Sequence, residues 1–466
     1  MNAQLQTIPQ PQTEPTQPQT DIPSWNLTLR IAFRFSMVYF GLYCYATEIL
    51  PGLFSATGGP GAVMPDGATL WPLRPVIFWT AAHIFHVKAP LSFDINSGTS
   101  DDMFGWVTAF CLLVIATAAT VVWSLLDRSR KNYAGLHKWF WLFVRFGLAG
   151  RMITYGMVKV FPVQMRYPPL TRLLQPFGTF SPFGVLINSI GSAPAYEIFT
   201  GCAMLAGGLL LIVPRTATLG ALVSLAASIE VFMLAMTYDV VAKLLAFHLI
   251  LLCCFLLAPD VPRLIRFHLL RRTSSLSAEV QLFRGVRANR IALAAQIIFG
   301  LWLVGVYCNQ AWGYWNTVGG GRPLSALYGI WEVRQMSIDE QPRPPLLTDS
   351  TRWRRAIFDY PDRMVVQNTD ESFAPYGASV NLQGKTLALT KSDDKNWTAS
   401  FTFQRPAEDQ LILNGRMDNH QVHMELQLTD RDSFLLVSRG FHWINEAPLG
   451  AKPSRYALAH HDRAQP

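Results

Sequence analysis

Charged residues are scarce in this sequence of 466 residues. Asp, Glu, Lys and Arg together make up 15% of the chain, whereas a soluble globular protein carries about 25%. Hydrophobic residues account for 50%. The shortage of charge excludes a soluble enzyme, an intrinsically disordered protein and a long coiled coil, because each of these carries more polar or charged surface. The sequence therefore predicts an integral membrane protein.

Cysteine and the common catalytic motifs are also scarce. The six cysteines lie in or beside apolar stretches, and none has the Cys-x-x-Cys spacing of zinc sites. The sequence contains no phosphate-binding loop, nucleophile elbow or His-Glu-x-x-His motif. His83 and His86 share a helix face, but no third ligand stands near them. No metal site and no catalytic residue is predicted, and whether the chain is an enzyme stays open.

The net charge of +8 is unevenly distributed. Residues 1–319 hold 22 Lys and Arg against 13 Asp and Glu, whereas residues 320–466 hold 17 against 18. Residues 1–27 are rich in Gln, Pro and Thr and are predicted to be a disordered cytoplasmic tail. Residues 451–466 are expected to be disordered as well. A basic region is missing at the start of the chain, so no signal peptide is predicted.

The apolar body predicts a helical membrane domain over residues 28–315. A helix needs about 20 apolar residues to cross the bilayer. Seven spans are expected, at residues 30–49, 103–126, 139–160, 195–213, 216–237, 240–258 and 290–312. Residues 72–87 are apolar but short, and we expect them to lie at the membrane interface. Residues 161–194 contain six prolines and predict a broken or interfacial hairpin.

The distribution of Lys and Arg predicts the orientation. Two loops, residues 127–138 and 260–290, hold eleven Lys and Arg and fall on the same side when there are seven spans. That side is expected to be the cytoplasm. The prediction is a multi-pass protein of a cell inner (plasma) membrane, with its N-terminus cytoplasmic and its tail extracytoplasmic. The basic surplus is explained by topology and contact with the lipid bilayer, so no nucleic acid partner is predicted.

The sequence changes character after Gly319-Gly320-Gly321. Short runs of alternating polar and apolar residues, separated by turn residues, are typical of an antiparallel meander. They predict an all-β extracytoplasmic domain over residues 322–450, closed as a barrel or folded as a sandwich. Nine strands are expected, at residues 328–336, 352–358, 363–367, 376–382, 386–391, 397–403, 410–413, 423–428 and 434–443.

One expected span carries several cations on the same face. At 100° per residue, Arg145, Arg151, Tyr155 and Lys159 share one third of the helix surface. A cation at the membrane centre costs at least about 2.5–3.5 kcal/mol on insertion scales. These side chains must therefore face protein or water rather than lipid.

Depth along the helices predicts the partners of these cations. The expected pairs are Arg151 with Glu230, Lys159 with Glu197, and Lys243 with Asp239 at a spacing of four residues. Two interpretations stay open. The charged residues are either ion pairs that fix helix packing or a ligand-binding site in the outer half of the bundle. The candidates for ligand binding are Arg145, Arg151, Tyr155, Lys159, Glu197, Glu230, Lys243 and His248.

The β tail contains a second candidate feature. Gly329-Ile330-Trp331 opens the first expected strand, and Arg439 lies in the last. This arrangement resembles the lipocalin-type signature, in which a Gly-x-Trp of the first strand packs under an arginine from the last. A guanidinium packs favourably on an indole face. Trp331 and Arg439 are therefore candidates for the barrel core or a ligand contact, and the alternative is an ordinary core tryptophan.

Three motifs follow one another in the helical body. They are Arg145 with Tyr155-Gly156-x-x-Lys159, then Tyr196-Glu197-x-x-Thr200-Gly201, and then Tyr238-Asp239-x-x-x-Lys243 with His248-Leu249. Together with the apolar hairpin around Pro214-Arg215, they resemble the DoxX-like family of bacterial membrane proteins over residues 140–263. The DoxX-like core is expected at residues 139–260. The combination of membrane helices with an extracytoplasmic β part also resembles that of vitamin K-dependent carboxylase-like proteins.

The DoxX-like resemblance implies a bacterial inner-membrane protein, in some relatives tied to quinone or thiol redox chemistry. A quinone is accordingly the candidate cofactor. Three functions stay open. The first is a redox-associated protein whose bundle binds a quinone-like head group. The second is a non-enzymatic, membrane-anchored, lipocalin-like protein whose tail binds an apolar small molecule or an envelope partner. The third is a carboxylase-like or other membrane enzyme with Lys159 or Lys243 as the base.

Overall fold

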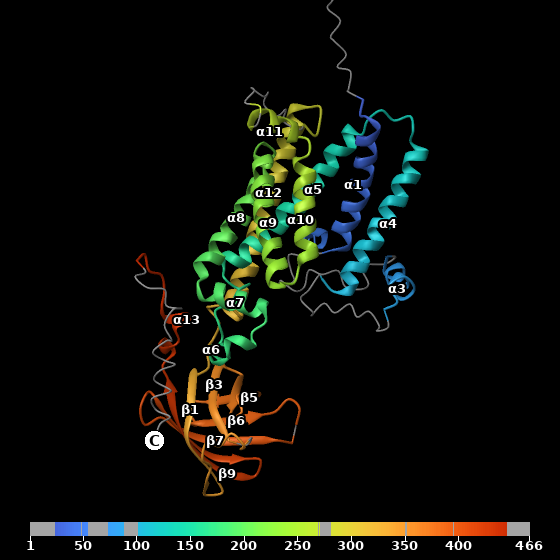
Figure 1. Ribbon diagram of the computed structural model, residues 1–466. Coiled ribbons are helices and arrows are strands. Elements are labelled where there is room, and N and C mark those ends of the chain that lie inside the picture. The colour runs from blue at the N-terminus through green and yellow to red at the C-terminus, as the bar shows by residue number, and fades with distance from the viewer. Residues whose placement is uncertain are drawn as a thin grey trace, which may run out of the picture.

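The computed structural model describes residues 24–47, 49–54, 73–87, 101–268, 270, 281–349, 352–394 and 396–444. A helical bundle is followed by a β-barrel, which lies below one end of the bundle in Figure 1. The expected tail at 451–466, and most of the expected tail at 1–27, lie outside the described residues.

Each of the seven expected spans corresponds to a helix. The long helices are α1 (Leu27–Ala46), α4 (Met103–Leu126), α5 (Ala134–Val160), α8 (Pro194–Ile212), α9 (Ala217–Tyr238), α10 (Lys243–Leu257) and α12 (Val286–Thr317). They run roughly along one common direction in Figure 1. The shorter helices are α2 (Ile49–Phe54), α3 (Leu73–His83), α6 (Leu170–Leu174), α7 (Pro182–Ser192) and α11 (Val261–His268).

The prediction of seven spans is not supported by helix length and composition. Within the described residues, four helices are long and apolar enough to cross a membrane: α4, α8, α9 with the turn before it, and α12. Helix α10 has only 15 residues. Helices α1 and α5 are long enough, but Arg30 and Arg34 in α1 and the four Lys and Arg residues of α5 lower their mean hydropathy. Helix α3, with 11 residues, extends about 16 Å, roughly half of the bilayer core.

Helix α5 is the most enclosed helix, since every residue from Val144 to Ile153 is buried. It crosses α8 closely because both helices place glycine at the contact. A Cβ atom on Gly156 would lie 2.8 Å from the backbone nitrogen of Leu205, and a Cβ atom on Gly201 would lie 2.7 Å from the Cβ atom of Lys159. Small residues permit this close approach of membrane helices.

The basic loops meet at one end of the bundle. Near the start of α1, the backbone N–H of Trp25 donates to the Lys131 carbonyl at 3.0 Å. The Nζ atom of Lys138 donates to the Gln281 carbonyl, also at 3.0 Å, and joins the first basic loop to the end of the second. Helix α12 then runs from this end to the barrel, so the barrel and the basic loops lie at opposite ends (Figure 1).

The tail is a closed barrel of eight antiparallel strands. These strands are β1 (Gly329–Ile338), β3 (Trp353–Tyr360), β4 (Arg363–Asn368), β5 (Phe373–Asn381), β6 (Thr386–Thr390), β7 (Thr398–Gln404), β8 (Gln410–Met417) and β9 (His420–Thr429), with the short β2 (Gln341–Pro342) paired to the end of β1. Each strand pairs with the next, and β9 pairs with β1 to close the barrel. Strand β7 alternates exposed and buried residues, the pattern expected when one face lines a core.

Eight of the nine expected strands are present, and the ninth prediction is wrong. Residues 434–443 form no strand and include the short helix α13 (Leu435–Ser438). The physical reason is closure: β9 pairs with β1 from Thr429 with Ile330 to Val422 with Ile338. A closed barrel has no free edge that another strand could join.

The proline-rich hairpin is broken as expected and supports the barrel. Helix α6 lies directly above the barrel in Figure 1. Leu170 of α6 packs in a buried cluster with Ile330 and Ile357, and its backbone N–H donates to Asp359 at 3.1 Å. Asp359 also forms an ion pair with Arg322, which lies between α12 and the barrel. Both isoleucines lie on the outer face of their strands, so α6 packs against the outer wall of the barrel near the bundle.

Candidate functional site

The cations of α5 are buried as predicted, but they contact different partners. Arg145 is 1% exposed. Its Nη2 atom donates to the side-chain oxygen of Gln296 on α12. Its guanidinium lies 5.1 Å from the Trp141 ring centre and 5.2 Å from that of Phe146. Aromatic faces attract a desolvated cation, so Arg145 is partly compensated without an acidic partner among these contacts.

Arg151 lies deeper in the bundle and also contacts α12. Its Nη2 atom donates to the hydroxyl of Tyr307 at 3.2 Å. Tyr307 in turn donates to the carbonyl of Gly52. The expected ion pair with Glu230 is wrong for the described residues, because Glu230 is engaged elsewhere. The Tyr196 hydroxyl donates to Glu230 at 3.2 Å.

Lys159 lies with two acidic residues at the crossing of α5 and α8. It is buried, and it lies within electrostatic range of Glu230 and Glu197. Glu197 is also buried, and its Oε1 atom accepts a hydrogen bond from the backbone N–H of Met165 at 2.9 Å. The described residues contain no direct ion pair between Lys159 and Glu197, so their predicted pairing is not confirmed, although the two charges influence each other at longer range. Glu197 additionally holds the start of the proline-rich hairpin.

Tyr155 and Lys243 complete the predicted set on these helices. Tyr155 is half-buried and packs against the main bundle core. The Nζ atom of Lys243 lies 2.7 Å from Asp239, which confirms the predicted pair, and 3.8 Å from Asp101. Asp101 accepts hydrogen bonds from the backbone N–H groups of Lys243 and Leu244, so it caps α10. Lys243 is therefore part of a helix cap.

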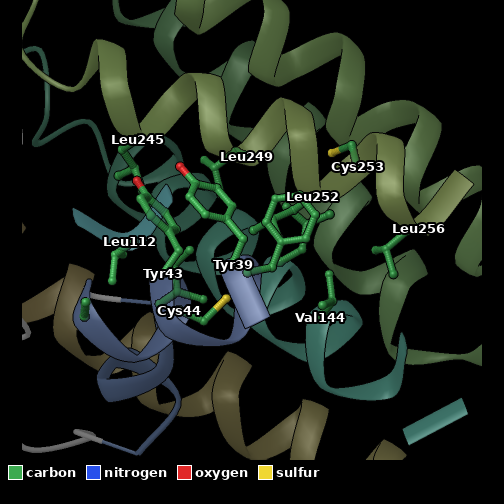
Figure 2. Packing of buried hydrophobic residues seen from close by; sticks show 14 of the residues in the cluster. Tyr39, Tyr43, Cys44, Leu112, Val144, Leu245, Leu249, Leu252, Cys253 and Leu256 are labelled. Carbon is green, nitrogen blue, oxygen red and sulfur yellow. The ribbon is translucent and has the colours of Figure 1, made fainter. Parts of the chain in front are cut away.

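His248 is satisfied by its own bundle neighbours. Its Nδ1 atom lies 2.7 Å from the carbonyl of Leu244, to which it must donate, so Nε2 accepts from the Tyr39 hydroxyl at 2.8 Å. The ring stacks on Tyr43 with 3.7 Å between ring centres. Figure 2 shows Tyr39 and Tyr43 packed beside Leu249 and the other labelled leucines of α10. This arrangement favours a structural role for His248.

Trp331 is a core residue of the barrel, as expected, but the arginine beside it is a different one. Its side chain is 1% exposed and its indole N–H donates to the Leu327 carbonyl at 2.9 Å. The guanidinium over the ring belongs to Arg405, in the loop after β7, at 5.6 Å from the ring centre. The placement of Arg439 in the last strand is wrong. Arg439 is exposed after α13, because the last strand ends at Thr429.

The end of the barrel that faces away from the bundle holds a cavity of about 870 Å³. Its floor contains Trp353, Tyr376 and Trp397. The ring centres of Trp353 and Tyr376 are 5.9 Å apart, and those of Tyr376 and Trp397 are 5.0 Å apart. The turns β1–β2, β4–β5, β6–β7 and β8–β9 form its rim. We call this cavity the barrel mouth.

Both signs of charge lie around the barrel mouth. The Nζ atom of Lys391 lies 4.8 Å from the Trp397 ring centre. The ring of His420 donates to Asp339 at 2.6 Å, and this hydrogen bond lowers the pKa of Asp339 below its ordinary value. Burial raises the pKa of Tyr376, so its hydroxyl stays neutral at physiological pH and donates or accepts hydrogen bonds. The mouth therefore combines an aromatic floor with polar groups at its rim.

Sequence reasoning missed the barrel mouth because its residues come from separate strands. Trp353 opens β3, Tyr376 lies in β5, and Trp397 immediately precedes β7. Each lies within an expected strand, at 352–358, 376–382 or 397–403. Only the closed strand order brings them together. Arg405 was missed for a related reason, since it stands just past a run that was expected to end at Phe403.

In the described part of the chain, no group of three His, Cys, Asp or Glu residues is arranged to hold a metal ion. No protein-family model matches the sequence, and neither a curated protein nor a solved structure matches it. The resemblances to DoxX-like proteins and to lipocalins therefore remain predictions.

Proposed function

We propose that this chain is a membrane-embedded binding protein whose barrel mouth takes a flat, apolar or aromatic small molecule. The observation that carries this proposal is the aromatic floor formed by Trp353, Tyr376 and Trp397 in a cavity of about 870 Å³. Ligand cavities commonly measure about 300–1,000 Å³ and combine apolar walls with a few polar groups. Antiparallel barrels of this kind bind ligands at their open ends.

Only one end of the barrel is suited to this role. The end facing the bundle is filled by Trp331 and Arg405, and Leu170 of α6 packs on the outer wall beside it. The opposite end carries the barrel mouth and points away from the helices (Figure 1). A ligand therefore enters from the aqueous phase rather than from the bundle. We also propose that this phase is the extracytoplasmic one, because the basic loops lie at the other end of the molecule.

The polar groups of the barrel mouth restrict the ligand chemistry. Lys391 offers an ammonium donor at the edge of the aromatic floor. Arg343 lies near Asp349 at 3.7 Å, and His420 is bonded to Asp339. Asp393 and Asp418 also line the mouth, so its charge is not uniformly positive. Lys391 forms no ion pair among the described residues and is the cation that lies on the aromatic floor, so it is the group best placed to donate to an acceptor. The favoured ligand is a flat ring system with one carbonyl or carboxylate group.

The quinone interpretation fits the described geometry less well. Lys159 and Glu197 lie at a helix crossing so close that a Cβ atom on Gly201 would clash with Lys159. The cavities at the barrel mouth and at the basic end of the bundle are both lined by other residues. The candidates Lys159, Glu197 and Glu230 are therefore not assigned to a quinone.

Binding of 2-naphthoate to the full chain in lipid nanodiscs tests the proposal. This flat carboxylate should be retained in equilibrium dialysis and should quench tryptophan fluorescence. Trp397→Ala should weaken binding about two- to tenfold, because stacking of an aromatic pair contributes roughly 0.5–1.5 kcal/mol beyond the area it buries. Lys391→Gln should weaken naphthoate binding more than binding of uncharged naphthalene.

Trp443→Ala provides the matched control. Trp443 is 91% exposed and does not line the barrel mouth. Its replacement removes one tryptophan signal and should leave the dissociation constant unchanged. Equal weakening by Trp397→Ala and Trp443→Ala, or naphthoate binding that survives both Trp353→Ala and Trp397→Ala, would contradict a site at the barrel mouth.

A further inference from the structure

A second cavity lies between helices at the basic end of the bundle, far from the barrel. It has a volume of about 480 Å³ and is lined by α5, by the turn between α8 and α9, and by the start of α12. Arg145, Arg215 and Arg290 line it, and none of its other described lining residues is acidic. We call it the arginine pocket. Three guanidinium groups around one cavity favour the binding of an anion.

Arg145 gives this pocket a buried donor group. Its side chain is 1% exposed, and Gln296 accepts from its Nη2 atom only. The Nε and Nη1 atoms of Arg145 are buried and have no hydrogen-bond partner among the described residues. A buried charged donor without a partner is costly, so native proteins rarely leave one unoccupied. These two groups lie at opposite edges of the guanidinium, so each can donate to a separate acceptor oxygen.

Gln296 fixes the guanidinium in this orientation. Its Nε2 atom donates to the Ala292 carbonyl at 2.9 Å, which leaves its Oε1 atom pointing at Arg145. Trp141 lies against one face of the guanidinium at 5.1 Å and is held by a hydrogen bond to the Leu256 carbonyl. The polar groups of Gln296 and Trp141 are thus already hydrogen-bonded, and these two side chains hold Arg145 in place at the floor of the pocket.

The mouth of the pocket carries the two exposed arginines. Arg215 lies in the turn between α8 and α9, and Arg290 lies in the second turn of α12. Arg145 lies about 16 Å into α5, counted at 1.5 Å per residue from Ala134. The walls between mouth and floor include Leu142, Val213 and Leu293. The pocket therefore leads from a basic surface to a buried cation along apolar walls.

We propose that the arginine pocket binds a phosphate group, with Arg145 at its floor and Arg215 and Arg290 at its mouth. Two sources share this chemistry, the headgroup of an anionic phospholipid and a soluble phosphorylated molecule. Basic pockets between membrane helices bind anionic headgroups in other membrane proteins. The apolar walls beside helices long enough to cross a membrane favour the lipid. This site is separate from the barrel mouth, so each is tested independently.

The test uses the full chain in detergent with added lipid. Dioleoylphosphatidylglycerol should raise the melting temperature and remain bound in native mass spectrometry, whereas dioleoylphosphatidylcholine should do neither. A ligand that binds only the folded state raises its melting temperature in this way. Arg290→Gln and Arg215→Gln should each weaken phosphatidylglycerol binding at least about tenfold, as expected for the loss of one charge-assisted hydrogen bond.

Arg287→Gln is the matched control. Arg287 is exposed, lies in the first turn of α12, three residues before Arg290, and does not line the pocket. Its replacement should leave phosphatidylglycerol binding unchanged. Arg145→Gln should abolish it, and if that variant does not fold, the two mouth variants decide the outcome.

Glycerol 3-phosphate and inorganic phosphate distinguish the two sources. Failure of both to stabilise the protein at millimolar concentration, with phosphatidylglycerol effective, assigns the pocket to lipid. If either soluble phosphate stabilises the protein, and this effect is lost in Arg290→Gln and kept in Arg287→Gln, the phosphate site is supported with a soluble source. The proposal would be overturned if Arg287→Gln and Arg290→Gln weakened phosphatidylglycerol binding equally, or if the two lipids raised the melting temperature equally. Either result indicates unspecific attraction to a basic surface.

Discussion

At the scale of single residues, Trp331 shows how a barrel core depends on one large side chain. It is fully enclosed, bonded to Leu327 and covered by Arg405. Trp331→Ala should destabilise the barrel by about 3–5 kcal/mol, because it leaves a cavity in a packed core. Urea unfolding of the full chain, followed by near-ultraviolet circular dichroism, measures this loss.

The companion variants separate packing from the cation contact. Arg405→Ala should cost only about 0.5–1 kcal/mol, the value of an exposed cation–π contact. Trp443→Ala should leave the unfolding midpoint unchanged, since that side chain is 91% exposed. A Trp331→Ala barrel as stable as the wild type would show that this indole is not part of the core.

The hydrogen bond from His420 to Asp339 makes barrel stability depend on pH. It lowers the pKa of Asp339 below its ordinary value of 3.8. Because the folded-state pKa is the lower one, the stabilisation is complete above pH 3.8 and is lost as the pH falls through the lowered value. The melting temperature of the barrel should therefore decrease in acid, and Asp339→Asn should reduce this dependence.

Asn suits this position, because Asp339 has φ 49° and asparagine tolerates this conformation. Asp393→Asn, on the same rim, is the control and should keep the wild-type pH dependence. An Asp339→Asn profile that coincides with the wild type between pH 5 and pH 3 would exclude Asp339 as the titrating group.

The sequence predicts which residues are buried better than it predicts their partners. The shared face of Arg145, Arg151 and Lys159 follows from helix geometry alone, and all three are buried. Depth matching failed for Arg151 because depth says nothing about which helices are neighbours. Its partner Tyr307 comes from α12, which was not considered for the pairing.

At the scale of elements, the crossing of α5 and α8 determines where Lys159 and Glu197 meet. Gly201→Ala should destabilise the protein, because the new Cβ atom would lie 2.7 Å from the Cβ atom of Lys159 and 2.8 Å from the backbone nitrogen of Val160. The helices would have to separate, at a cost of about 1–3 kcal/mol for overpacking. Thermal unfolding in detergent measures this effect.

Gly305→Ala is the matched control on α12. A Cβ atom there meets nothing within 4 Å, so the change should be neutral or stabilise the protein by up to about 1 kcal/mol. Equal melting temperatures for Gly201→Ala and wild type would mean that the two helices are not packed as closely as described.

Strands with a clear alternation of polar and apolar residues were predictable, but the number of strands was not, because it depends on where the barrel closes. The alternation of polar and apolar residues located β1 and β3 to β9 to within a few residues, because one face of each strand lines the core. The same alternation cannot say when a barrel closes. Residues 434–443 therefore looked like a ninth strand, although β9 had already paired with β1.

At the scale of the whole molecule, the distribution of Lys and Arg between the two ends predicts the topology. Both basic loops lie at the end opposite the barrel, as the bond from Lys138 to Gln281 and the course of α12 show. Lys and Arg near the ends of membrane helices favour the cytoplasmic side. Reporter fusions after residue 135 should therefore be cytoplasmic, and fusions after residue 325 extracytoplasmic.

This prediction holds if α5 and α10 both cross the membrane or if neither does. Helices α8, α9 and α12 pass the length and composition criteria. Between residue 135 and the barrel, the chain then crosses the membrane three times, or five times when α5 and α10 are included. Both numbers are odd, so the barrel lies on the side opposite the basic loop. Cysteine labelling at residues 135 and 325 with a membrane-impermeant maleimide, in a variant without native cysteines, measures the two sides directly. If both positions react from the same side, the chain crosses an even number of times, and the mouth of the barrel opens into the compartment that holds the basic loops.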